Sequence, residues 1–240
     1  MAETRIQLCG TLVARIEGQR IESELRGRQA RLAFVYLVAH RSRPVPRTEL
    51  LNALWPEPPA GEALSPLLSK LRRVAPVTGR TELHLSLRAD AWIDLEAAAE
   101  GLHRAETAIA RRDWAMAWSP ARVAQHIAAR GFLPGEDPPW VEDIRHRLEE
   151  IHIRSLELVG QACLGIGAGE LDMAERSART LLALAPYRET GHRLLMETLA
   201  ARGNSAEALL VYEGLRQRLR AELGAAPSTQ TQELHRRLLR

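Results

Sequence analysis

The C-terminal part of this chain contains a pattern that recurs every 34 residues, and that recurrence limits the possible folds more than any other feature. Glycines and apolar residues occupy matching positions in two units: Gly169 and Gly203, Ala174 and Ala208, Ala178 and Tyr212, Leu181 and Leu215. A unit of this length with two helix-spaced apolar segments predicts a helical hairpin. One hairpin cannot bury its apolar face alone, and a stable stack needs about three, so the helices before Gly169 must complete the stack.

The residues that precede this repeat are also predicted to be helical. After Asp94 no alternating pattern follows, and apolar residues recur at helical spacing in three segments. A loop rich in Gly and Pro, at residues 131–139, separates the last two segments. The expected helices begin at Asp94, which can cap the first of them, at Trp114 and at Trp140, and the last two end near Ala129 and Leu164.

The first 94 residues mix strand and helix patterns. The expected elements are two antiparallel strands within residues 5–15, a helix over 27–40, a short helix opened by Thr48 and stopped by Pro56, Pro58 and Pro59, a third short helix from Ser65, and a hairpin of residues 83–87 and 91–93. This order is typical of a winged helix-turn-helix domain. The predicted fold class is therefore mainly α, with an N-terminal α+β domain followed by an all-α domain of helical repeats.

The third helix of this pattern is amphipathic, with a basic polar side. Ser65 is a good N-cap and Pro66 is favourable at the first helical position, so we expect a helix of about ten residues to start there. At about 100° per residue, its apolar and polar side chains fall on opposite faces. The apolar face carries Leu64, Leu67, Leu68, Leu71 and Ala75, and the polar face carries Ser69, Lys70 and Arg73. The pattern identifies the face that packs in the core. The opposite face could contact either water or a phosphate backbone.

Positive charge is concentrated near this helix. The formal net charge of the whole chain is only +3. Residues 1–94 hold 14 Lys or Arg against 10 Asp or Glu, a net of +4, whereas residues 95–240 hold 19 against 20, a net of −1. The excess therefore lies in the domain that carries the basic helix, as expected for a polyanionic partner.

Several classes of function are disfavoured. No segment approaches the ~18 consecutive apolar residues of a membrane span, and the N-terminus lacks the apolar core of a signal peptide, so we expect a cytoplasmic protein with no membrane partner. Cys9 and Cys163 lie far apart without metal-ligand spacing, which favours two buried free thiols. No phosphate-binding glycine loop, nucleophile elbow or zinc motif occurs, so we expect no enzyme activity, cofactor or metal site.

The C-terminal half also carries motifs in the order and spacing of a known family. They are Gly131-Phe132-Leu133-Pro134-Gly135 with Trp140-Val141, Leu184-Ala185-Pro186-Tyr187-Arg188-Glu189 with His192-Arg193-Leu194-Leu195-Met196, Ala206-Glu207-Ala208-Leu209 with Tyr212-Glu213, and Glu222-Leu223-Gly224 with Pro227-Ser228. This half resembles the bacterial transcriptional activator domain of regulators of the Streptomyces antibiotic regulatory protein (SARP) type, whose helical repeats are similar to tetratricopeptide repeats (TPR-like). Nearer the N-terminus, Glu49-Leu50-Leu51 with Leu54-Trp55-Pro56 is similar to the second helix of the family's winged helix, and Ser69-Lys70-Leu71-Arg72-Arg73 to the end of its recognition helix.

The resemblance implies two domains and a function. A winged helix-turn-helix DNA-binding domain would occupy residues 1–94, and a bacterial transcriptional activator domain residues 95–240. It further implies a transcriptional activator that binds repeated promoter half-sites on double-stranded DNA. The helical-repeat domain would mediate homodimerisation and contact the RNA polymerase holoenzyme.

In a winged helix of this kind the third helix enters the major groove, and the second helix and the hairpin approach the DNA backbone. Lysine and arginine can donate to guanine O6 and N7, whereas a residue on the flank of the helix is better placed for phosphate. The expected DNA-binding residues are Ser65, Ser69, Lys70 and Arg73 on the third helix, Arg72 on its flank, and Arg47, Thr48, Arg80 and Arg88 as further phosphate contacts.

A second hypothesis stays open. The third helix is short, so the winged helix could be degenerate and serve protein contacts instead of DNA binding. The chain would then be a helical adaptor that does not bind DNA. The basic excess in the N-terminal domain favours the first hypothesis.

Overall fold

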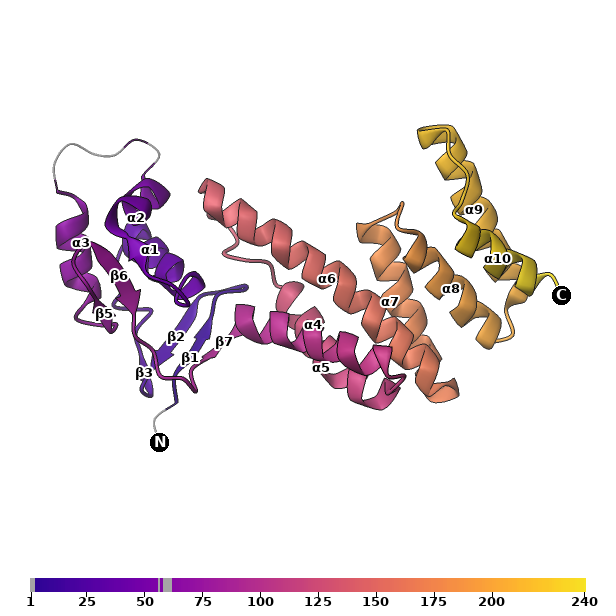
Figure 1. The fold of residues 1–240 in the computed structure, drawn as a ribbon, viewed down its shortest axis with the longest axis horizontal. Coiled ribbons are helices and arrows are strands. Elements are labelled where there is room, and N and C mark those ends of the chain that lie inside the picture. The colour runs from indigo at the N-terminus through magenta and orange to yellow at the C-terminus, as the bar shows by residue number, and fades with distance from the viewer. Residues whose placement is uncertain (1–2, 56, 58–61) are drawn as a thin grey trace. The chain divides into compact units, whose positions relative to one another are not determined.

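The computed structural model describes residues 3–55, 57 and 62–240, and the chain divides into two compact units. The first unit comprises residues 1–97 and 130–148, and the second comprises residues 98–129 and 149–240. The predicted fold class is confirmed, since sheets and short helices precede a long series of helices (Figure 1). The division into units differs from the predicted boundary after residue 94, because residues 130–148 make their contacts with the N-terminal residues.

Among its described residues, the first unit contains two small sheets and the helices of the winged-helix pattern. Its elements are β1 (Arg5–Gln7), β2 (Val13–Ile16), β3 (Gln19–Arg20), α1 (Arg28–Ala39), β4 (Val45–Pro46), α2 (Arg47–Leu54), α3 (Leu64–Leu71), β5 (Val77–Thr78), β6 (Glu82–Leu85) and β7 (Trp92–Ile93). One sheet has the strand order β3-β2-β1-β7, and the other has the order β4-β6-β5. The prolines expected to stop the second helix, at positions 56, 58 and 59, lie outside the described residues.

The helix α1 forms the centre of this unit. Ala30, Phe34, Leu37 and Val38 share one face at helical spacing and are buried, and Arg28 and Arg31 are exposed. Burial extends around the helix from Leu32 to Val38, so neighbouring elements cover more of α1 than one amphipathic stripe requires. Both α2 and α3 pack against it.

The hairpin that follows α3 differs from the predicted one. β6 shows the expected alternation, with Leu83 and Leu85 buried, but it pairs with β5 and not with residues 91–93. Gly79 forms the turn with φ of +87°, and a Cβ atom there would lie 1.7 Å from the carbonyl oxygen of Glu82. Only glycine fits so tight a turn, which places the hairpin around Gly79.

The strand β7 instead joins the N-terminal sheet. β1 and β2 are antiparallel, as predicted, and β7 lies parallel to β1 on its other side with Ile93 opposite Ile6. The Trp92 amide also donates to the Thr4 carbonyl over 3.0 Å. The pairing of residues 83–87 with 91–93 was wrong because alternation identifies a strand but not the strand with which it pairs.

The third helix is shorter than predicted, and its N-cap lies two residues earlier. Ala63 precedes its first residue, so Ser65 is not the N-cap, and Ser65 and Pro66 lie within the first turn. Pro66 is tolerated there because the first N–H groups of a helix have no acceptor within it. The helix ends at Leu71 and not at Ala75, although the Ala75 amide still donates to the Leu71 carbonyl over 2.9 Å.

Main-chain contacts join the loop after residue 129 to the N-terminal sheet. The Gly10 amide donates to the Gly131 carbonyl over 2.8 Å, and Cys9 forms a β-bridge with Phe132. Asp94, which was expected to cap a helix, is fully buried, and its carboxylate accepts hydrogen bonds from the backbone amides of Leu8 and Cys9 over 2.9 Å each. The contacts of Gly131 and Phe132 join the start of residues 130–148 to the first unit.

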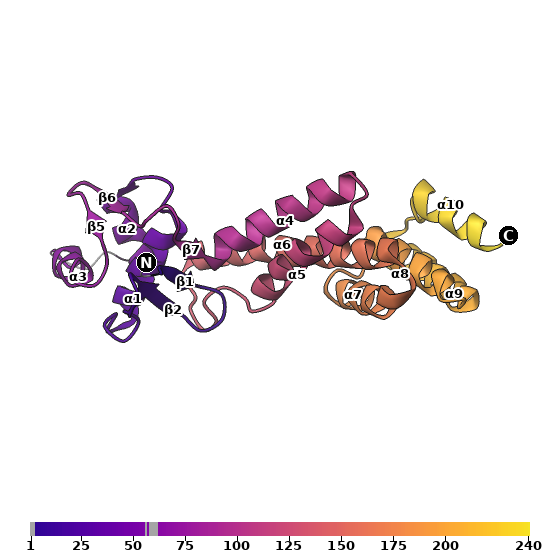
Figure 2. The ribbon, with the colours of Figure 1, turned by 90° about the horizontal axis from the view of Figure 1, so that it is seen from below.

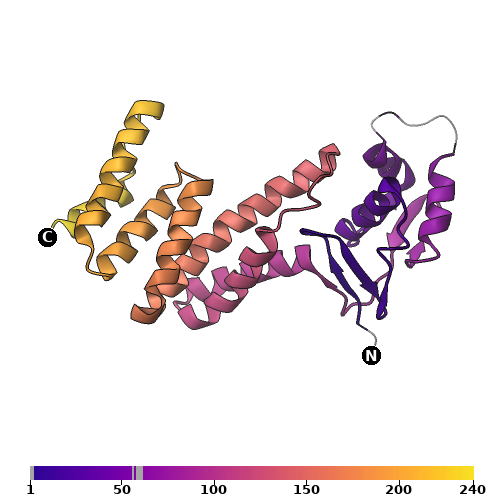
Figure 3. The same ribbon diagram turned by 180° about the vertical axis from the view of Figure 1, so that it is seen from behind.

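The remaining elements are helical throughout the described residues. They are α4 (Asp94–Ala110), α5 (Trp114–Ala128), α6 (Pro139–Ile166), the 3-10 turn η1 (Ala168–Glu170), α7 (Leu171–Leu184), α8 (Glu189–Ala201), α9 (Ser205–Leu223) and α10 (Thr229–Leu238). In the second unit α7, α8 and α9 lie side by side in sequence order (Figures 1 and 3). Ala174, Ala208 and Leu181 are completely buried, and Leu215 is 1% exposed. The predicted helical repeat is therefore confirmed.

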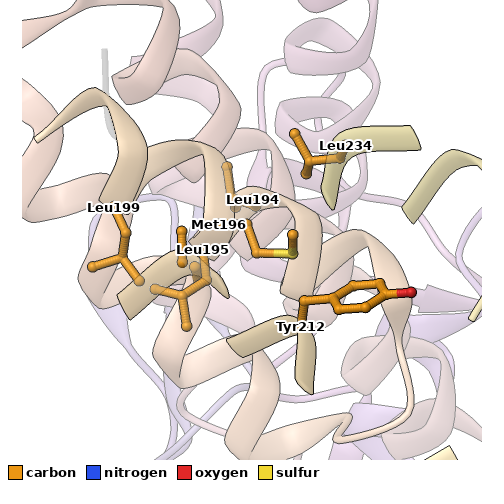
Figure 4. Packing of buried hydrophobic residues seen from close by; sticks show 8 residues of the cluster. Leu194, Leu195, Met196, Leu199, Tyr212 and Leu234 are labelled. Carbon is orange, nitrogen blue, oxygen red and sulfur yellow. The ribbon is translucent and has the colours of Figure 1, made fainter. Parts of the chain in front are cut away.

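The core of the last helices combines side chains from four elements (Figure 4). Ala178 comes from α7, Leu194, Leu195, Met196 and Leu199 come from α8, Ala208 and Tyr212 come from α9, and Leu234 comes from α10. Fully burying a side chain of this size stabilises a fold by roughly 1.5 to 3 kcal/mol. This cluster joins the two helical hairpins of the 34-residue repeat.

A charged group is also buried in the second unit. Glu157 on α6 is 1% exposed, and Arg154 and Arg188 donate to its carboxylate over 2.8 and 2.7 Å. The Thr190 hydroxyl, at the start of α8, donates to it as well. Burial alone would raise the pKa of Glu157, but these donors outweigh burial and hold that pKa below its ordinary value. The ionised carboxylate therefore stabilises the contact between α6 and α8.

We expect Glu157→Gln to lower the free energy of unfolding by about 1 to 3 kcal/mol at neutral pH, because two arginines lose their buried partner. The pKa of Glu157 is lower in the folded protein than its ordinary value of 4.5. The ionised carboxylate therefore stabilises the fold above pH 4.5, and this stabilisation is lost as the pH falls below that value. Denaturant unfolding of both proteins at several pH values should show that the difference between their free energies of unfolding disappears as the pH falls. Glu233→Gln, on the exposed side of α10, is the control. A difference that stayed constant at acidic pH would contradict this role of the charge.

Candidate nucleic-acid interface

The helix α3 presents the predicted basic face to solvent. Leu64, Leu68 and Leu71 are at most 3% exposed, whereas Leu67 is partly exposed. Ser69, Lys70 and Arg73 are exposed, as their positions on the helix predict. Figure 2 shows α3 nearly end-on, with β5 and β6 beside it. The exposed side of α3 and the hairpin of β5 and β6, which we call the wing, together form the candidate interface.

Three cations of this interface have no partner among the described residues. Neither Lys70 nor Arg73 forms an ion pair or a side-chain hydrogen bond there, and the same holds for Arg80 in the turn of the wing. All three side chains are exposed. They are free to donate to a phosphate or to a base edge.

Arg72 has a different position from the one predicted. Its Nε donates to the Val77 carbonyl over 3.3 Å, and its Nη2 donates to the Gly79 carbonyl. Both carbonyls belong to the wing, so the guanidinium joins the end of α3 to the turn of the hairpin. From its place on the flank of the helix, Arg72 was predicted to contact a phosphate. No local sequence pattern indicated that it would donate to these carbonyl oxygens.

The first turns of α2 and α3 are joined by side chains. Arg47 donates from Nη2 to the Ser65 hydroxyl oxygen over 2.6 Å, and the same hydroxyl donates to the Glu62 carboxylate over 2.8 Å. Thr48, the next residue of α2, is exposed. Arg47 and Ser65 therefore help to place α2 against α3, while Thr48 stays accessible at the start of its helix.

Arg88 lies outside the wing. It follows β6, in the connection to β7, and its Nε donates to the Asp90 carboxylate over 2.9 Å. Arg80 and Arg88 were both predicted as phosphate contacts. Arg80 lies in the turn of the hairpin, and Arg88 lies after the hairpin.

Acidic side chains near α2 are already neutralised. Arg43 donates to the Glu49 carboxylate over 3.0 Å, and the Tyr36 hydroxyl donates to it over 2.6 Å. The Arg43 guanidinium, helped by Tyr36, holds the pKa of Glu49 below its ordinary value, and burial with the nearby carboxylate raises the pKa of Tyr36 to about 12. Glu49 thus adds little negative potential at the start of α2.

The sequence from residue 93 to residue 239 decides the family. The model of the bacterial transcriptional activator domain matches residues 93–239. The chain belongs to this family. The resemblance to SARP-type regulators is thereby confirmed, and the bacterial transcriptional activator domain family consists of transcriptional regulators and not of enzymes.

Two relatives are named Regulatory protein AfsR. The one from Streptomyces griseus is 29% identical, and the one from Streptomyces coelicolor is 32% identical, each over 218 residues. The aligned part is 88% of this chain but 22% of each relative. This member of the family therefore spans about a fifth of the length of the curated relatives it matches.

A solved structure shares the fold. It is that of Mycobacterium tuberculosis EmbR in complex with a low affinity phosphopeptide, with a TM-score of 0.83 and 22% sequence identity. The match covers 99% of this chain and 64% of the EmbR chain. Within the part of the chain that the structure describes, no helix is both long and apolar enough to cross a bilayer, and no group of three His, Cys, Asp or Glu side chains could hold a metal ion.

We expect Arg72→Ala to loosen the wing, because the variant loses both donors to the Val77 and Gly79 carbonyls. The free energy of opening the hairpin should fall by about 1 kcal/mol, which speeds its amide exchange roughly fivefold. Hydrogen exchange of the β5 and β6 amides measures this change. Arg73→Ala is the matched control, since the neighbouring arginine is exposed and has no partner among the described residues. Equal exchange rates in both variants would show that Arg72 does not hold the wing.

Proposed function

We propose that this chain is a DNA-binding transcriptional activator of the SARP type. The observation that carries the proposal is the arrangement of α3. Its leucine face is buried. Lys70 on the opposite face and Arg73, two residues after the helix ends, are exposed cations without partners in the described structure. An unpartnered cation on an exposed helix in a basic domain is suited to a polyanion.

In this proposal α3 enters the major groove of double-stranded DNA. Lys70 and Arg73 would donate to base edges, most favourably to guanine O6 and N7, and Ser69 to a base edge or a phosphate. Arg80 in the wing and Thr48 at the start of α2 would contact phosphates, which positions the protein without reading sequence. The main role of Arg72 would be to hold the wing against α3, and that of Arg47 and Ser65 would be to hold α2 against α3. Arg88 would lie at the edge of the DNA-binding surface.

The helical repeats would carry the other functions. We assign residues 1–94 to DNA binding and residues 95–240 to the activator domain, which would mediate homodimerisation and contact the RNA polymerase holoenzyme in the cytoplasm. Stacked helical hairpins offer an extended surface for such contacts. The family match and the regulatory relatives support this assignment.

The alternative is a helical adaptor that does not bind DNA. Two observations favour it: α3 is only 8 residues long, and Arg72 is bound to the wing. A degenerate winged helix could use the same exposed face for protein contacts. The variants below separate the two functions.

We expect Arg73→Ala and Lys70→Ala to weaken binding to a preferred duplex by about 1 to 3 kcal/mol each and to relax its sequence preference, while the melting temperature stays unchanged. The measurement is the dissociation constant for a selected duplex over a salt series. Leu71→Ala is the contrasting control, since loss of this buried side chain should cost about 2 to 5 kcal/mol of stability and abolish binding by unfolding. If both variants and their double mutant kept full affinity and sequence preference, the helical adaptor would be the better account of this protein than the DNA-binding activator.

We also expect two protomers on one duplex that carries a repeated half-site, because regulators of this type are expected to occupy such sites as dimers. Sedimentation of the protein with a duplex of two half-sites gives the stoichiometry directly. A duplex with one half-site is the control and should bind more weakly. One protomer per two-site duplex at saturating protein would rule out the dimer.

A further inference from the structure

A hollow beside α3 has basic side chains on two sides. It measures about 390 Å³ and lies between the end of α3 and the segment that precedes α1. Lys70 lines it from α3, Arg73 lines it from the turn just after that helix, and Arg26 lines it from the other side. Arg26 was not among the residues predicted to bind DNA, because its local sequence shows no helical or strand pattern.

The charges in this hollow are not compensated. Within the described residues, Arg26, Lys70 and Arg73 form no ion pair or side-chain hydrogen bond, and all three are exposed. Glu24 also lines the hollow, yet it pairs with none of them, so the hollow keeps an excess of positive charge. Elsewhere in the same unit arginines do find acidic partners, as Arg41 does with Glu96 over 2.6 Å.

Apolar side chains line the hollow together with the cations. Leu25, Leu71 and Val74 contribute to this lining. A free phosphate ion prefers a fully polar site, whereas a nucleic-acid strand presents an apolar deoxyribose next to each charged phosphate. Arg26 together with this apolar lining therefore fits the sugar-phosphate backbone at the edge of the groove better than a small hydrated anion.

We propose that this hollow seats the sugar-phosphate backbone of one DNA strand, and that Arg26 contacts a phosphate while α3 lies in the adjacent major groove. This inference rests on the proposed DNA binding and adds a residue outside the helix-turn-helix to it. Arg26 would fix the position of α3 on the duplex and would not discriminate between sequences.

The experiment compares Arg26→Ala with Arg31→Ala in the full chain. Arg31 is the matched control: it is exposed on α1, has no partner among the described residues, and does not line the hollow. Dissociation constants are measured over a salt series for a selected duplex and for an unrelated duplex of the same length. Arg26→Ala should weaken both duplexes several-fold by the same factor and reduce the slope of log affinity against log salt by about 0.9, whereas Arg31→Ala should change neither.

Three results would overturn the assignment. If Arg26→Ala behaved like Arg31→Ala while Arg73→Ala still weakened binding, the proposed function would stand and only the role of Arg26 would fail. If the unaltered protein bound no duplex, both would fail. If inorganic phosphate displaced the duplex more than chloride did at equal ionic strength, and only when Arg26 was present, the hollow would be a site for a free anion and not for a DNA strand.

Discussion

The burial of three leucines on α3 is the constraint on which the candidate interface depends. A helix of 8 residues is not stable alone in water, so α3 exists because Leu64, Leu68 and Leu71 are buried in the first unit. Each contributes roughly 1.5 to 3 kcal/mol by its removal from water. Because the side chains of a helix are fixed relative to one another, this burial also determines that Ser69 and Lys70 point outward, and Arg73 in the following turn is exposed as well. Packing thus sets the direction of the basic face before any ligand is present.

The basic residues around α3 have two kinds of role. Arg72 and Arg47 use their donors within the protein, on the wing carbonyls and on Ser65, and thereby hold the parts of the winged helix together. Lys70, Arg73 and Arg80 have no such partners among the described residues and remain available to a ligand. An arginine is therefore assigned to the interface by what its guanidinium contacts and not by its charge alone.

The helical repeat of the second unit combines apolar packing with one buried charge. Fully buried alanines at positions 174 and 208 let helices approach closely, and the buried Glu157 carboxylate joins α6 to the start of α8 through Arg188 and Thr190. A buried charge is tolerated because donors surround it. The repeat motifs and this ion pair together give an ordered surface of helices, which is what the proposed contacts with a second protomer and with polymerase would require.

The sequence by itself determined the helices, their buried faces, the 34-residue repeat and the family, because periodicity and motif spacing are properties of neighbouring residues. The leucine face of α3 and the buried Ala174 and Ala208 are examples. Only the tertiary structure decided that β6 pairs with β5, that residues 130–148 pack with the first unit, and that Arg72 binds the wing while Arg26 lines the hollow beside α3. Strand partners and side-chain acceptors are chosen among residues brought together by folding, and the local pattern around a strand or an arginine does not contain that information.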